Sequence, residues 1–273
     1  MAEMSVIWLR VAAALYSLGL LHAILTLVRR REYLFRLALA AIAFGSIFHF
    51  VSIMEEGIVT NRCPIANFYE SLSMCAFLVV IAYLLVHWRY KVESLSVFIF
   101  PLVFVMTLVA TLGNPVSAWS SPAVRSVWLT VHIVLVLLGY AALLFSAVSS
   151  VVYLFQEREL KAKTPRKFFH KLPPLGTLDE LMSESMAVGF VLITLAVIAG
   201  STWAFIELKA DWIRKPEIAI SFFTWGTYMA LIFLRTNAGW RGRKAAIMTV
   251  TVLGFSALTW AAHAQLGTLL IKP

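Results

Sequence analysis

Histidine is the residue type in this chain whose chemistry is most informative. Of the six histidines, four lie inside long apolar runs: His22, His49, His132 and His263. An ionisable side chain within an apolar segment is costly to bury and therefore indicates a functional site. A neutral imidazole can bind a metal through one ring nitrogen or form hydrogen bonds between helices. His87 and His170 lie in or beside basic segments, which favours ordinary solvated side chains.

The two cysteines offer no comparable site. Cys63 and Cys75 are twelve residues apart and form no CxxC pair of the kind that exchanges disulfides. Their number and spacing do not support a zinc site either. The sequence contains no recognisable nucleophile, metal or phosphate motif, so a carrier or an assembly factor is favoured over a self-contained enzyme.

The elements that must position the histidines are membrane-spanning helices. The 273 residues are 61% hydrophobic and 14% charged, far more apolar than a soluble domain. Charges gather between apolar runs of about 20 residues, the length that a helix needs to cross the hydrocarbon core. Such runs cover residues 6–28, 33–54, 68–88, 95–112, 127–155, 186–206, 218–235 and 245–271. The sequence predicts an all-α polytopic membrane protein with eight transmembrane helices, forming a single membrane domain over residues 1–273 with its first span retained.

Basic residues predict the orientation of these helices. If alternate connections face the cytoplasm, sixteen of the 23 Lys and Arg residues lie on the inner side, as the positive-inside rule requires. Both termini should then face outward from a bacterial-type inner (plasma) membrane. The net charge of +9 fits contact with the anionic lipid of the bilayer, and no nucleic-acid platform accompanies it. The longest inner connection, residues 156–185, is interpreted as a solvated linker, with a partner surface as the alternative.

Depth in the membrane separates the four apolar histidines. His49, His132 and His263 fall near the outer ends of their spans, whereas His22 lies in an inner half, roughly 15 Å from the level of His49. His22 is therefore interpreted as a hydrogen-bonding residue between helices. Two imidazoles on facing helices can hold the iron of a haem from both sides. The alternative is that each histidine forms only hydrogen bonds across helices.

Aromatic and basic residues near the outer side would suit a haem. Five tryptophans fall there: Trp119, Trp128, Trp203, Trp212 and Trp260. They form either an interfacial aromatic belt or a surface on which a porphyrin stacks. Four cations could bind its propionates: Arg125, Lys209, Arg214 and Lys215. Arg125 leads because an arginine fork matches a carboxylate and because it lies seven residues before His132.

Several short fragments together resemble a known family. They are Phe48-His49, Ala66-Asn67-Phe68-Tyr69-Glu70-Ser71, Trp128-Leu129-Thr130-Val131-His132, Gly139-Tyr140-Ala141-Ala142, Gly200-Ser201-Thr202-Trp203-Ala204, Thr224-Trp225-Gly226-Thr227-Tyr228, Gly239-Trp240-Arg241-Gly242-Arg243 and His263. Their order, over nearly the whole chain, is similar to the membrane haem-handling family of cytochrome c assembly, the CcsA and CcmC type.

This resemblance implies specific roles for the histidines. In the family, a tryptophan-rich outer segment lies against haem, and two histidines from the flanking spans bind its iron; the matching residues here are His132 and His263. A further histidine pair inside the membrane is matched by His49, but its partner position holds Phe233. The resemblance implies a haem carrier or chaperone that binds b-type haem non-covalently and works with a cytochrome c assembly partner.

The tryptophan-rich segment departs from the family pattern. The chain keeps Trp203, Trp212 and Pro216, but it has Leu208 and Arg214 in place of two tryptophans and Lys215 in place of an aspartate. The chain therefore also resembles a divergent branch that includes HemX and YpjD-type proteins. That branch implies a regulator of a cytosolic tetrapyrrole-synthesis enzyme, glutamyl-tRNA reductase. A non-haem structural or transport subunit is the third alternative.

Other residues are predicted to be structural. The glycines at positions 189, 200, 226 and 254 favour close packing of helices. Asn67 and Glu70 open the third span, where an acidic residue suits a helix N-terminus. Contact with a ligand is the alternative for this pair.

Overall fold

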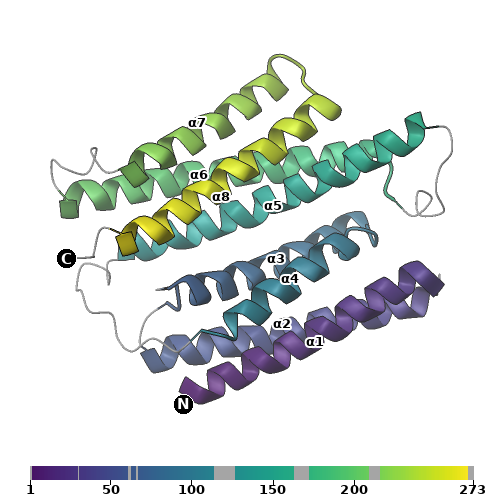
Figure 1. Ribbon diagram of the computed structural model, residues 1–273, viewed down its shortest axis with the longest axis horizontal. Coiled ribbons are helices and arrows are strands. Elements are labelled where there is room, and N and C mark those ends of the chain that lie inside the picture. Colours follow the sequence, from purple (N-terminus) through teal and green to yellow (C-terminus); the bar gives the residue numbers. More distant parts are fainter. Residues whose placement is uncertain are drawn as a thin grey trace. The chain divides into compact units, whose positions relative to one another are not determined.

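The chain is described by a computed structural model over residues 2–29, 31–60, 63–65, 67–113, 127–162, 172–208 and 216–269. These residues form eight helices (Figure 1). They are α1 (Ala2–Arg29), α2 (Glu32–Thr60), α3 (Phe68–Tyr90), α4 (Ser96–Ala110), α5 (Val127–Lys161), α6 (Leu175–Leu208), α7 (Pro216–Thr236) and α8 (Arg243–Leu269). Each predicted span corresponds to one of them.

Length and composition allow most of these helices to span a membrane. Six helices of the described residues are long and apolar enough to cross a membrane: α1, α2, α3, α5, α6 and α7. Helix α4 is apolar but has only 15 residues, and α8 has 27 residues. The prediction of an all-α, multi-pass membrane protein is confirmed.

Helix α6 begins earlier than the sequence predicts. It starts at Leu175, whereas the apolar run begins at residue 186. Asp179 and Glu180 interrupt the hydropathy, yet Leu178 and Leu181, three positions apart on one helix face, are both buried. The prediction of a solvated linker is therefore wrong for residues 175–185. A partner surface on the rest of the 156–185 connection stays a prediction.

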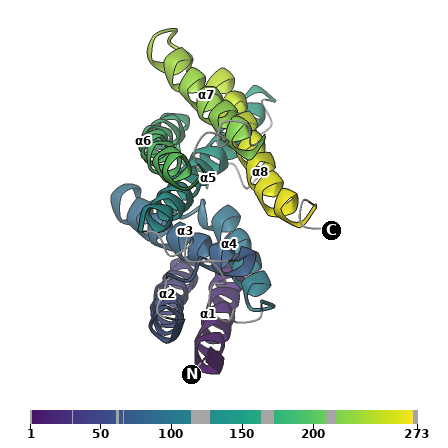
Figure 2. The same ribbon diagram turned by 90° about the vertical axis from the view of Figure 1, so that its left-hand side faces the viewer.

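The chain divides into two compact units. Unit 1 contains α1 to α4, and unit 2 contains α5 to α8. In unit 1, α1 and α2 lie side by side (Figures 1 and 2), and glycine permits the contact. A Cβ atom added at Gly45 would lie 2.6 Å from Cε1 of Tyr16. The prediction of one membrane domain over residues 1–273 stays a prediction.

Unit 2 is built around the packing of α5 on α6, with α8 against α5 and α7 against both α6 and α8. Its buried core consists of Leu143, Met186, Ile193, Tyr228, Leu231 and Val252. The predicted close packing is confirmed at Gly189, which faces the Tyr228 hydroxyl, and at Gly200. It is wrong at Gly226 and Gly254, where no described atom lies within 4 Å of an added Cβ.

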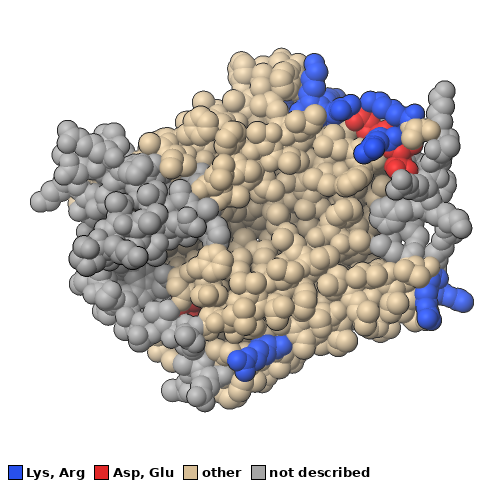
Figure 3. All heavy atoms as spheres, viewed as in Figure 1, with Lys and Arg blue, Asp and Glu red and all other residues tan. Residues whose placement is uncertain are grey.

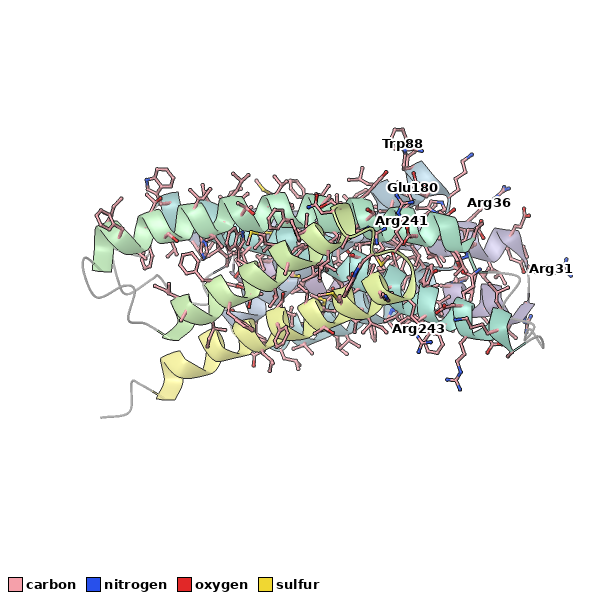
Figure 4. The ribbon with its side chains drawn as sticks, turned by 90° about the horizontal axis from the view of Figure 1, so that it is seen from above. Arg31, Arg36, Trp88, Glu180, Arg241 and Arg243 are labelled. Atoms are coloured by element: carbon pink, nitrogen blue, oxygen red, sulfur yellow. The ribbon has the colours of Figure 1, made fainter. Side chains whose placement is uncertain are left out.

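Each unit has one end at which exposed basic side chains gather, termed its basic end. In unit 1 these residues are Arg29, Arg31, Arg36, Arg89 and Lys91, and in unit 2 they are Arg158, Lys161, Arg241, Arg243 and Lys244. The visible Lys and Arg side chains of unit 2 gather around the turn from α7 to α8 (Figure 3). Figure 4 shows Glu180 of α6 at the same end of unit 2 as Arg241 and Arg243.

An ion pair joins three segments at the basic end of unit 2. Nη2 of Arg235 on α7 lies 2.9 Å from Oδ2 of Asp179 on α6, and Nε of Arg235 donates to Ser183 at 2.9 Å. The other carboxylate oxygen of Asp179 accepts from the backbone N–H of Gly242, at 3.2 Å. Gly242 has φ +61°, which suits glycine. Asp179, Ser183, Arg235 and Gly242 form the ionic hub of unit 2.

Candidate functional site

His132 lies near the start of α5, at the end of unit 2 opposite the basic end. Its Nδ1 is 2.7 Å from the backbone carbonyl oxygen of Ala196 on α6. Because a carbonyl oxygen can only accept, Nδ1 must carry the hydrogen, and the lone pair of the neutral imidazole then resides on Nε2. Metal-binding histidines commonly use this arrangement, in which a hydrogen bond at one nitrogen fixes the tautomer of the other.

The ring of His132 packs directly on the backbone of α6 at Gly200. A Cβ atom added at Gly200 would lie 2.5 Å from Nδ1 and 2.6 Å from Cε1 of His132. Ala196 and Gly200 are four residues apart and therefore share one face of α6. That face both accepts the His132 hydrogen bond and leaves room for the ring.

Trp203 continues the same face of α6, one turn beyond Gly200. Its indole Nε1 is buried and has no hydrogen-bond partner among the described residues. Trp225 on α7 behaves differently, because its Nε1 donates to Thr194 at 3.1 Å. Buried indole N–H groups usually find an acceptor, so Trp203 presents a donor suited to a ligand. Trp128, one turn before His132, is 52% exposed.

His49 in unit 1 is held in a different way. It is fully buried in α2, and its Nε2 lies 2.9 Å from the Ser73 hydroxyl of α3. Its Nδ1 lies 3.3 Å from the Tyr16 hydroxyl of α1. Both ring nitrogens therefore face hydroxyl groups, and His49, Tyr16 and Ser73 form a neutral hub that joins three helices.

Ser73 also lines a small pocket, with both polar and apolar walls, at the end of unit 1 opposite its basic end. The pocket includes the side chains of Ser5, Ser52, Glu56, Asn67 and Glu70. Asn67 caps α3, because its Oδ1 accepts from the Glu70 backbone N–H at 2.8 Å while its Nδ2 donates to Glu70 Oε1 at 3.1 Å. The structural role predicted for Asn67 and Glu70 is confirmed.

Comparison with known proteins assigns a family to this arrangement. A family model described as Cytochrome C assembly protein matches residues 65–262. The chain belongs to the cytochrome c assembly protein family. The cytochrome c biogenesis protein CcsA of Prochlorococcus marinus strain MIT 9301 is 30% identical over 216 residues, which cover 71% of this chain and 70% of the relative. The CcsA protein of Prochlorococcus marinus subsp. pastoris is 28% identical over 233 residues, or 76% of this chain and 73% of the relative.

The cytochrome c assembly match includes His132, Gly200 and Trp203, whereas His49 precedes its first residue. His263 follows its last residue by one position. The backbone of His263 belongs to α8, which packs against α5, so the two histidines stand on neighbouring helices. The side chain of His263 lies outside the described residues, as do Trp212 and Arg125.

Sequence reasoning was wrong about two histidines and missed the partners of two others. The predicted solvated side chain of His87 is instead half-buried, with its ring against those of Phe35 and Tyr83 at centroid distances of 5.2 Å and 6.1 Å. Nδ1 of His22 faces the Leu18 carbonyl of its own helix, at 2.8 Å, and the predicted bond between helices is not the one described. The partners of His132 and His49 are distant along the chain, and only Gly200 carried a signal, as a small residue in an apolar span.

Proposed function

We propose that this cytochrome c assembly membrane protein binds b-type haem non-covalently near the outer face of the membrane and acts as a haem carrier or chaperone. The single observation that carries the proposal is the hydrogen bond from His132 Nδ1 to the Ala196 carbonyl. It sets the tautomer in which Nε2 has the lone pair that an iron ligand needs. Haem would supply an iron with two axial positions for imidazole.

The surroundings of His132 fit a haem. The buried indole N–H of Trp203, one turn from Gly200, offers a donor for a propionate oxygen. Trp128 is half exposed one turn from His132, where its ring can stack on a porphyrin. Trp212 is proposed as a second stacking residue and Arg125 as the propionate cation, by resemblance to the family and by position in the sequence.

The second axial ligand is proposed to be His263. It lies about two turns before the end of α8, and His132 lies about two turns after the start of α5, roughly 10 Å or less from each helix end. These two helix ends lie opposite the basic end of unit 2. Following the positive-inside rule, we propose that the basic ends face the cytoplasm and that both histidines lie toward the outside of a bacterial-type inner membrane.

A second haem site at His49 receives less support. Iron binding through Nε2 would require His49 to give up the 2.9 Å bond to Ser73. The position that holds the partner histidine in the family is Phe233, whose side chain has no ligand atom. We propose that a bis-histidine haem at His49 is absent, and that any haem bound by His49 would use a different partner.

An absorption spectrum of the purified protein, oxidised and reduced, tests the haem proposal. The expected result is an intense porphyrin band with the low-spin pattern of bis-imidazole haem. Release of the pigment by acidified organic solvent would show that the haem is non-covalent. A colourless protein that also fails to take up added haem would contradict the proposal and favour a structural or transport subunit.

One observation favours a second function, a regulator like HemX. The chain has Arg214 and Lys215 where the family pattern has tryptophan and aspartate, while exposed Arg241, Arg243 and Lys244 are available at the basic end. Affinity purification from solubilised membranes separates the two functions. A carrier retains an extracytoplasmic assembly partner, whereas a regulator retains a soluble enzyme of tetrapyrrole synthesis.

A further inference from the structure

We infer that Gly200 is a positioning residue, which holds the His132 ring in the orientation of a ligand by leaving the space that the ring occupies. The ligand role of His132 rests on the proposed function. The contact between Gly200 and the ring does not depend on that function, and its effect on thermal unfolding can be measured without haem.

The space at Gly200 is occupied by the ring itself and not by the end of a flexible chain. An added Cβ would lie 2.5 Å from Nδ1, 2.6 Å from Cε1 and 3.2 Å from Cγ of His132. Non-bonded heavy atoms prefer separations of about 3.5–4.0 Å. Three atoms of one rigid ring are too close, so the whole imidazole would have to move.

Movement of the ring breaks the bond that fixes its tautomer. The atom closest to the added Cβ is Nδ1, which also donates to the Ala196 carbonyl at 2.7 Å. The ring cannot turn away from an alanine at position 200 and keep this short bond. Gly200 and Ala196, one helical turn apart, therefore act together: the glycine admits the ring and the carbonyl orients it.

Two other glycines provide matched controls. Gly189 lies on the same helix, and a Cβ there would meet the Tyr228 hydroxyl and not His132. Gly226 lies on α7 with no described atom within 4 Å of an added Cβ. Gly189→Ala therefore introduces a tight contact at another position of α6, against Tyr228 of α7. Gly226→Ala makes the same glycine-to-alanine change where no described atom is in contact.

The first test compares the haem spectra and reduction potentials of Gly200→Ala, Gly189→Ala and Gly226→Ala at equal haem occupancy. We expect Gly200→Ala to lose most of its low-spin signal or to shift its potential, while both controls keep the wild-type values. Equal spectra in all three variants would overturn the inference. A wild-type protein without haem would contradict the proposed function instead.

The second test needs no haem and works if Gly200→Ala is unstable. Thermal unfolding is measured for Gly200→Ala, His132→Ala and the double variant. Removal of the ring removes the clash, so Gly200→Ala should lower the midpoint in the presence of His132 and change it little in its absence. Equal losses in both backgrounds would mean that Gly200 does not act on His132.

Discussion

The two units hold a histidine in opposite ways, fully buried in unit 1 and half-buried in unit 2. In unit 1, both nitrogens of His49 face hydroxyl groups from neighbouring helices, at 2.9 Å and 3.3 Å. In unit 2, one nitrogen of His132 faces a backbone carbonyl and its ring rests on a glycine. Hydroxyl partners can donate or accept and leave the tautomer open, whereas a carbonyl fixes it. The first arrangement joins helices, and the second is the one that we propose for a ligand of haem.

The polar contact that holds helices of unit 2 together lies away from His132. The ionic hub joins α6, α7 and the turn before α8 through Asp179 and Arg235, at the end remote from His132. Unit 1 instead relies on the neutral hub of His49, Tyr16 and Ser73. Substitutions in the two hubs should therefore change stability, while substitution of His132 should change the spectrum.

The largest loss of stability is expected from Asp179→Ala. It leaves Arg235, whose side chain is 8% exposed, without its carboxylate, and it removes the acceptor of the Gly242 N–H. Because the Asp179 side chain is 23% exposed, the cost should lie near the lower end of the roughly 3–5 kcal/mol lost when one partner of a buried pair is removed. Unfolding of the detergent-solubilised variant and wild type by heat or denaturant would measure this loss of stability.

Glu157→Gln is the matched control for Asp179→Ala. It removes the charge that pairs with Lys161, 65% exposed, at 2.7 Å, while the amide oxygen of Gln can still accept a hydrogen bond. An exposed pair of this kind contributes about 0.3–0.5 kcal/mol. Comparable losses from both variants would show that the ionic hub has no special role.

A smaller loss is expected from His49→Ala. It leaves a cavity and two buried hydroxyls, Tyr16 and Ser73, without their partner, for a cost of about 2–3 kcal/mol. The haem spectrum of folded His49→Ala, recorded before its unfolding is measured, should match that of the wild type. A low-spin spectrum that survives in the double variant His132→Ala, His263→Ala would instead show that His49 binds haem with another partner.

Among the substitutions in the two hubs, the smallest effect is expected from Tyr16→Phe. It removes one hydroxyl and the longer of the two His49 bonds, 3.3 Å, while it keeps the ring that packs on Gly45. Hydrogen bonds between membrane helices contribute about 0.6 kcal/mol on average and about 1.7 at most. Unfolding of Tyr16→Phe and Ser73→Ala side by side would rank the two bonds. A loss from Tyr16→Phe larger than that from His49→Ala would refute the neutral hub as described.

Sequence patterns predicted the helices better than their contacts. Eight apolar runs located the eight helices because lipid demands long apolar segments. The start of α6 was missed because Asp179 and Glu180 look like a linker until Arg235, distant in sequence, is seen to pair with Asp179. His49 drew the same interpretation as His132 because both are histidines near an outer helix end. Their described hydrogen bonds differ: His49 contacts the hydroxyls of Ser73 and Tyr16, and His132 contacts the Ala196 carbonyl.

The central claim, that His132 and His263 bind one haem, is tested most directly by the spectra of the two single alanine variants. Each variant should leave iron with one protein ligand and shift the spectrum away from the bis-imidazole form. Added imidazole should partly restore that form, because it can enter the vacated position. His87→Ala should match the wild type. If both single variants bind haem with an unchanged spectrum, His132 and His263 are not the ligands and the account of this site is wrong.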